Sequence, residues 1–334
     1  MTWPTPIAEL EPTIVFDSYW KFIADRYAIY LRRLRGEPPP WTSDPILSRY
    51  KFTNVFRVTD RVSQKGVDIS LDGISATSIE EQFFRIILFK LFNKIETWQA
   101  LTEALGEEPR LANFNFARYN GIFDELMRKK MIIYSAAYMM PCPGDYGVNG
   151  ITRKHSMHLH MLGDMLDARV PYYLLEVGNL EKAYGVLRKV RMFGDFTAYQ
   201  FIIDVNYGPF LGYREDEFIV PGPGSNEGIK KCFRNPGKVP HAEIIRRVTE
   251  EAELCSRAVT GASPPTLFGR PLQLIDIQNC FCEIAKYARV AHPEFNNTRT
   301  RIKQPYNPSW FRPLEKPIFP RQWEIAFTAQ ELSS

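Results

Sequence analysis

The 334-residue sequence lacks the cysteine spacing of a disulfide or metal scaffold. Its five cysteines are an odd number, and no Cys-x-x-Cys pair occurs. This argues against a disulfide framework and a zinc ribbon, and it excludes a four-cysteine iron–sulfur loop. Because unpaired cysteines are typical of reducing compartments, we expect a protein of the cytoplasm or nucleus.

Three further signals are missing. No apolar run approaches the roughly 20 residues of a membrane-spanning helix, so we expect no membrane partner. The first ten residues carry prolines and Glu9 instead of the charged and apolar regions of a secretory leader. No Gly-x-x-x-x-Gly-Lys-Ser/Thr motif occurs, so the sequence carries no P-loop kinase signature.

Aromatic residues are plentiful, and basic residues gather near the C-terminal end. Aromatics make up 13% of the chain, a share that suits cores and base stacking alike. The net charge is +4, and residues 287–323 hold seven Lys/Arg and two acids, a local balance of 7 − 2 = +5. This segment therefore accounts for the whole positive excess, and the prolines from Asn296 onward predict an extended arm.

Apolar residues recur at three- and four-residue spacing along most of the chain, which predicts a mainly α protein. The first helix covers Phe16–Leu34 and stops at Gly36 and the prolines that follow. Thr77 and Ser78 precede two glutamates at capping-box spacing and predict a long helix over Ile79–Leu105, with a break near Trp98. The other expected helices cover 50–66, Phe114–Lys130, 154–166, 179–190, 196–206, 225–233, 240–260 and 273–288.

Polar residues share one face in the helix expected over residues 50–66. Arg57, Asp60, Arg61 and Gln64 follow the spacing i, i+3, i+4 and i+7. Such a set can clamp a phosphate or read a base edge, because arginine presents a planar fork of donors. A solvated, salt-bridged helix face is the alternative.

Two more expected helices carry polar residues among apolar ones. The long helix holds Arg85, Lys90, Asn93 and Lys94, which must find partners or face a cleft. The last helix places Asp276, Asn279, Glu283 and Lys286 on one face, where a desolvated pair could tune a general acid or base. A structural role is the alternative for both sets.

Two glycine turns precede expected helices. Gly194 stands before a helix that carries Gln200 and, one turn later, Asp204. This arrangement is similar to the turns of helix–hairpin–helix proteins, in which backbone amides approach a DNA phosphate. Gly222, Gly224 and Ser225 form a candidate anion nest, and a plain tight turn is the alternative.

Three histidines, His155, His158 and His160, stand close together. Because no acidic or cysteine partner is near in the sequence, we expect core or surface histidines and no metal site.

Five segments in order resemble a known family. They are Phe52–Gln64, Phe83–Trp98, Phe193–Tyr207, Val220–Gly224 and Asp276–Arg289. Together they resemble the alpha-glutamyl/putrescinyl thymine pyrophosphorylase family, whose helical domain also accompanies 5-hydroxymethyluracil DNA kinases. The resemblance implies a helical bundle like that of DNA glycosylases, related to helix–hairpin–helix proteins. The domains expected are an N-terminal helix and linker (1–45), a helical DNA base-modification domain (46–290) and a basic, aromatic arm (291–334).

The resemblance also implies a reaction. A pyrophosphorylated 5-hydroxymethyluracil in DNA would lose its pyrophosphate to an attacking amine, with the base flipped out of the duplex. Cations would neutralise the leaving group, and a carboxylate would take the amine proton. The candidate catalytic residues are Asp204, Asp276, Glu283 and Lys286. The candidate substrate or phosphate ligands are Arg57, Asp60, Arg61, Gln64, Arg85, Lys90, Asn93 and Gln200. The candidate DNA-backbone contacts are Gly194, Gly222, Gly224, Ser225, Arg299, Arg301 and Lys303.

The expected partners are DNA and a small amine or amino acid, and no cofactor is expected. Two alternatives stay open. One is a glycosylase-like hydrolase that excises a modified pyrimidine, and the other is a non-catalytic DNA-binding module.

Overall fold

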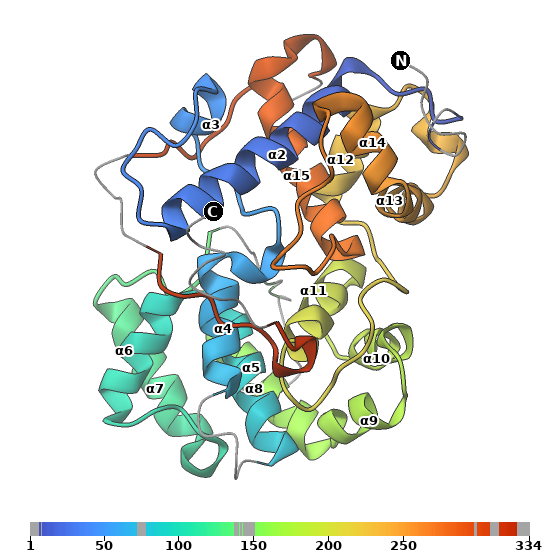
Figure 1. The fold of residues 1–334 in the computed structure, drawn as a ribbon. Coiled ribbons are helices and arrows are strands. Elements are labelled where there is room, and N and C mark those ends of the chain that lie inside the picture. Colours follow the sequence, from blue (N-terminus) through green and yellow to red (C-terminus); the bar gives the residue numbers. More distant parts are fainter. Residues whose placement is uncertain are drawn as a thin grey trace. The chain divides into compact units, whose positions relative to one another are not determined.

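The computed structural model describes residues 7, 9–71, 78–136, 140, 142, 151–296, 299–307 and 314–325. Within these residues the chain forms α-helices, short 3-10 helices and isolated β-bridges but no strand (Figure 1). The mainly α prediction is therefore confirmed, while the likeness to DNA glycosylases stays a prediction. No described helix is both long and apolar enough to cross a membrane.

The chain divides into two compact units. Unit 1 comprises Met1–Asp60, Glu215–Pro317 and Glu324–Ser334, and unit 2 comprises Arg61–Arg214 and Ile318–Trp323. The domain boundaries expected after residues 45 and 290 stay a prediction.

The elements of unit 1 come from both ends of the sequence. They are α2 (Ile14–Leu34), α3 (Pro45–Arg49), η1 (Arg57–Thr59), α12 (Pro223–Cys232), η4 (Pro236–Lys238), α13 (His241–Glu250), α14 (Ala252–Thr260), α15 (Leu274–Ala291) and η5 (Pro293–Phe295).

Helix α15 is the centre of unit 1, and α12 packs closely along it. A Cβ on Gly228 would lie 1.9 Å from the Phe281 carbonyl oxygen, and one on Gly224 would lie 2.3 Å from Cys282 Sγ. The two glycines stand one helical turn apart, so they open one face of α12 to α15. Helix α2 packs on α15 as well, where the rings of Tyr19 and Phe281 stack with centroids 4.5 Å apart.

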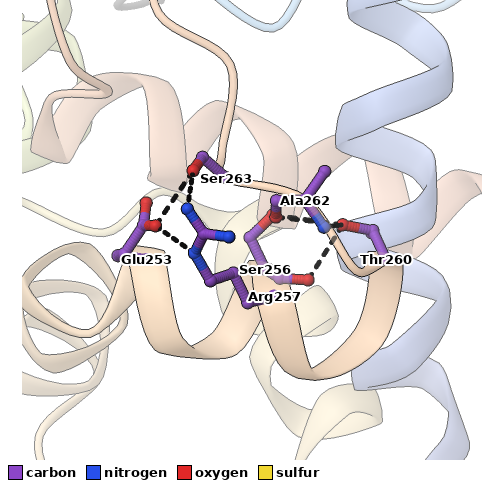
Figure 2. Close-up of polar contacts among 6 residues, drawn as sticks. All are labelled: Glu253, Ser256, Arg257, Thr260, Ala262 and Ser263. Carbon is purple, nitrogen blue, oxygen red and sulfur yellow. Dashed lines mark hydrogen bonds and ion pairs between the residues drawn. The ribbon is translucent and has the colours of Figure 1, made fainter.

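Helix α14 ends in a polar network (Figure 2). Arg257 donates to Ser263 Oγ at 2.7 Å and to Glu253 Oε1 at 2.5 Å, while Ser256 Oγ donates to the Ala262 carbonyl at 2.9 Å. These side chains bind the groups that follow the left-handed residue Gly261, where the helix stops. The Arg257–Glu253 ion pair is exposed, so its expected contribution to stability is small.

Unit 2 is an all-helical group assembled on α5. Its elements are α4 (Arg61–Leu71), α5 (Ile79–Phe92), α6 (Ile95–Leu105), η3 (Leu111–Asn113), α7 (Phe116–Arg128), α8 (Lys154–Asp167), α9 (Val170–Glu176), α10 (Leu180–Leu187), α11 (Asp195–Asn206) and η7 (Arg321–Trp323). Every residue of α5 from Gln82 to Phe92 is buried. Helices α4, α8 and α11 pack against it.

Most expected helices are confirmed, with corrections at their ends. The long helix breaks at Asn93, which adopts the left-handed conformation at φ 51°, and not near Trp98. The helix expected over 240–260 is two helices that meet at Glu251. Helices α3 and α9 are too short to give a periodic signal. Ser78 caps α5 as expected, by accepting from the Glu81 amide at 3.2 Å, whereas Thr77 lies outside the described residues.

Candidate functional site

Carboxylates of α15 hold the irregular segment that precedes α4. Asp276 accepts hydrogen bonds from the Arg57 amide at 2.9 Å and from the Gln273 amide at 3.0 Å. Two turns later, Glu283 accepts from the Thr53 amide at 3.2 Å and pairs with Lys286 at 2.5 Å. The shared polar face of α15 is therefore confirmed, and its carboxylates bind backbone amides.

The same segment is also held by hydrogen bonds from its own side chains and from Arg26 of α2. Asp60 Oδ1 accepts from the Asn54 amide at 2.8 Å. Arg26 of α2 donates to Asn54 Oδ1 at 2.6 Å and to the Thr53 carbonyl at 3.0 Å. No described residue donates a hydrogen bond to Asp60 Oδ2, and Asp60 is only partly buried. Asp60 thus keeps one oxygen available for a ligand.

Three carboxylates of unit 1, those of Asp60, Glu215 and Asp276, interact electrostatically with Arg57, and we call these four residues the Arg57 cluster. Burial raises the pKa of Asp60 to about 7, that of Glu215 to about 7 and that of Asp276 to about 6. The positive charge of Arg57 opposes each of these rises. Such values lie close to neutral pH, where a carboxyl group can exchange a proton during a reaction.

The helix predicted over 50–66 is wrong in its first half. Residues 51–56 are irregular, and α4 begins only at Arg61. The physical reason is that the backbone amides of Asn54 and Arg57 donate to the carboxylates of Asp60 and Asp276. These amides therefore do not bond to carbonyl groups of a helix.

As a result, Arg57, Asp60, Arg61 and Gln64 do not share one helical face. Arg57 and Asp60 belong to unit 1. In unit 2, Arg61 forms an exposed ion pair with Glu96 at 3.3 Å, and Gln64 exchanges hydrogen bonds with the Ile318 backbone at 2.8 and 2.9 Å. The shared helical face is therefore wrong, whereas contacts of these residues with a phosphate stay a prediction.

In unit 2 the predicted residues form buried polar pairs. Lys90 of α5 and Asp204 of α11 lie 2.5 Å apart. Arg85, only 2% exposed, lies 3.7 Å from Glu108 and over the Trp98 ring. Two further expected ligands have other positions. Asn93 is the C-cap of α5, and Gln200 is buried in α11. Their roles toward a substrate stay predictions.

Of the two glycine turns, the one at Gly222–Ser225 has a structural explanation. Helix α12 begins at Pro223 with Gly222 as its N-cap, and not at Ser225. The buried Ser225 donates to the Gly222 carbonyl at 2.9 Å, and Gly224 packs on Cys282. The hydroxyl of Ser225 therefore does not cap the helix, and a contact of this turn with an anion stays a prediction. Gly194 is the exposed N-cap of α11, and its contact with DNA stays a prediction.

The C-terminal segment presents basic side chains at the surface of unit 1. Residues 304–306 pair with 49–51, through hydrogen bonds from Lys51 to Gln304 at 2.9 Å and from Tyr306 to Arg49 at 2.8 Å. Ile302 is buried, whereas its two neighbours are exposed. We call the exposed basic residues of 49–51 and 299–303 the basic strip; they are Arg49, Lys51, Arg299, Arg301 and Lys303. Arg49 lies over the ring of Tyr50, and the rings of Trp41 and Tyr306 pack edge to face.

Sequence reasoning missed three charged residues of unit 1. Arg26 lies on the apolar face of α2, a position at which a buried arginine could have been noticed. Glu215 and Arg270, which pair at 3.3 Å, stand in irregular segments with no periodic signal. The histidines have ordinary partners: His155 lies 3.0 Å from Asp124 and His158 lies 2.8 Å from the Tyr134 hydroxyl. The described residues hold no metal-binding group of three or more His, Cys, Asp or Glu side chains.

These observations define a class of all-helical protein with buried carboxyl groups whose pKa is raised. Residues 13–297 match the family described as the helical domain of 5-hmdU DNA kinase, and the chain belongs to this family. This confirms the helical domain that the sequence resembles.

A curated relative is similar over most of the chain. The 5-hmdU DNA kinase of Bacillus phage SP10 is 24% identical over 250 residues, which cover 70% of this chain and 39% of the relative. The chain thus spans about two fifths of the length of that relative. No solved structure matches the chain.

The raised pKa of Asp60 leads to a prediction about stability. Below pH 3.8 the carboxyl is neutral in both states, and above that value the unfolded chain loses its proton first. Folding then retains a proton that the unfolded state has released, so stability falls as the pH rises to about 7. Asp60→Asn, which cannot ionise, should gain stability relative to the wild type by about 1 kcal/mol per pH unit in this window.

Urea denaturation followed by circular dichroism from pH 4.5 to 8 measures this difference. Comparing the two proteins at each pH cancels the other titrating groups. A difference that is constant with pH would contradict the raised pKa.

Proposed function

We propose that this chain acts on 5-hydroxymethyluracil in DNA and forms part of a base-modification system. The observation that carries the proposal is the family match over residues 13–297. The similarity to the 5-hmdU DNA kinase of Bacillus phage SP10 supports this base as the substrate.

The basic strip supports DNA as the partner. Its Arg and Lys side chains are exposed, and Arg49 lies over the ring of Tyr50. Basic side chains bind phosphates, and aromatic rings stack on bases. Binding should therefore weaken as salt rises, because each neutralised phosphate releases counterions.

The specific reaction that we propose is the displacement of pyrophosphate by an amine. The amine nitrogen forms a bond to the 5-methylene carbon, the carbon–oxygen bond breaks, and pyrophosphate leaves with the electron pair. The nitrogen gives up one proton to a carboxylate. Asp60 suits this step better than Asp276 or Glu283, because it keeps one oxygen without a hydrogen bond and has a pKa of about 7. Arg57 supplies a neighbouring positive charge.

Mass spectrometry of nucleosides tests the proposal. The chain is incubated with DNA that contains 5-hydroxymethyluracil, bare or pyrophosphorylated, together with a pool of amino acids and polyamines. A heavier nucleoside is expected only from the pyrophosphorylated DNA, and thymine-containing DNA is the control. Unchanged nucleosides in every reaction would overturn the proposed chemistry.

A second candidate is a module that binds the modified DNA for a separate kinase. The observation that favours it is that the match covers only 39% of the phage 5-hmdU DNA kinase. The kinase activity of that relative can therefore belong to the part that this chain does not match. It predicts salt-sensitive binding of DNA with no new nucleoside, and a faster phosphorylation of 5-hydroxymethyluracil when a kinase is added.

A further inference from the structure

A pocket of unit 1 shares no residue with the Arg57 cluster. It is lined by Glu227, Lys230 and Lys231 of α12 and by Glu294 and Phe295 of η5, and it encloses about 260 Å³. Pockets for drug-sized ligands measure roughly 300–1,000 Å³, so this one suits a single small group.

Positive charge around this pocket exceeds what its carboxylates neutralise. Glu227 alone is shared by Lys231 at 3.8 Å, Arg289 at 3.3 Å and Arg299 at 3.9 Å. All three distances are long for ion pairs with a good hydrogen bond. Lys230 has no ion pair or hydrogen bond among the described residues and lies exposed at the rim.

The charge count supports an anionic ligand. Lys230, Lys231, Arg289 and Arg299 give four positive charges against two carboxylates, those of Glu227 and Glu294, and 4 − 2 leaves +2. In addition, Arg289 Nε is buried without a hydrogen-bond partner. An anion that entered the pocket would meet cations that share the single carboxylate of Glu227.

The pocket has an aromatic wall and leads into the basic strip. The ring of Phe295 is partly exposed and lines the cavity. Arg299 belongs both to the Glu227 group and to the basic strip, which continues to Arg301 and Lys303. A strand that followed the basic strip would therefore reach the pocket.

We propose that this pocket binds one nucleotide unit, with its phosphate at Lys230 and Arg299 and its base stacked on Phe295. The ligand chemistry is a phosphate ester of a nucleoside, which a DNA strand or a free mononucleotide can supply. The inference rests on the proposed role in DNA modification for its choice of nucleotide over other anions.

Calorimetric titration of the full chain with pentathymidylate, thymidine 5′-monophosphate and inorganic phosphate tests this assignment. Lys230→Ala should weaken binding of pentathymidylate severalfold and reduce the slope of log K against log salt by about 0.7. Phe295→Ala should weaken it by about fivefold or more, because one base loses its stacking partner. Glu227→Gln should tighten it, because the cations lose their shared carboxylate. Lys182→Ala, an exposed helical lysine of unit 2, is the matched control.

The opposite signs expected for Lys230→Ala and Glu227→Gln separate binding from a general loss of structure. Tighter binding of the pentamer than of the monophosphate assigns the pocket to a strand, and equal binding assigns it to a free nucleotide. Inorganic phosphate that binds as tightly as either, with no effect of Phe295→Ala, would overturn the nucleotide assignment. So would wild-type affinity in both Lys230→Ala and Phe295→Ala, or no binding of any ligand.

Failure of the proposed function has a different readout. In that case the nucleosides stay unchanged in the mass spectrometric reactions, while the effects of Lys230→Ala and Glu227→Gln on binding persist.

Discussion

Asp60→Asn is expected to lower kcat for the amine transfer by about 10²- to 10⁴-fold, the usual contribution of a general base. The amide oxygen of asparagine can still accept the hydrogen bond from the Asn54 amide, so the segment before α4 should keep its conformation. In the wild type, kcat should rise with pH and level off above about 7, because the carboxylate must be ionised to take a proton. Single-turnover rates from pH 5.5 to 9 measure both effects.

Glu215→Gln is the matched control for this prediction. Glu215 also has a pKa of about 7, but it is only 3% exposed and pairs with Arg270. This variant should keep the wild-type rate and its pH profile. If Asp60→Asn retained the rate while Glu215→Gln lost it, Asp60 would not be the base.

Gly228→Ala should destabilise unit 1 by about 3 kcal/mol, at the upper end of overpacking effects. Its Cβ would lie 1.9 Å from the Phe281 carbonyl oxygen and 2.8 Å from the carbonyl carbon, so the α15 backbone itself would have to move. A flexible side chain cannot relieve this contact. Urea denaturation followed by circular dichroism measures the loss.

Gly185→Ala provides the comparison, because Gly185 also lies within a helix, α10, and a Cβ there would meet nothing within 4 Å. It should stabilise the protein by about 0.5–1 kcal/mol through the higher helix propensity of alanine. Equal effects of the two substitutions would mean that α12 and α15 do not approach as closely as described.

Periodicity predicted the helices but not the segment that matters most for the site. Helices α2, α5, α7 and α15 have enough apolar residues at three- and four-residue spacing to be found from the sequence. Residues 52–60 carry a similar pattern, yet they are mostly irregular. Amides of this segment donate hydrogen bonds to the carboxylates of Asp276 and Glu283, which lie more than 200 positions away in the sequence. A rule based on neighbouring residues cannot predict such bonds.

The composition and spacing of residues by themselves determined the mainly α class, most helix positions, the polar face of α15 and the basic character of the C-terminal segment. Each depends on neighbours along the chain, since helical side chains three or four residues apart meet on one face. Only the tertiary structure decided that Asp60, Glu215 and Asp276 interact electrostatically with Arg57, and that Arg61 and Gln64 belong to the other unit. It also decided which carboxylates acquire a raised pKa, because burial is a property of the packed fold and not of the local sequence.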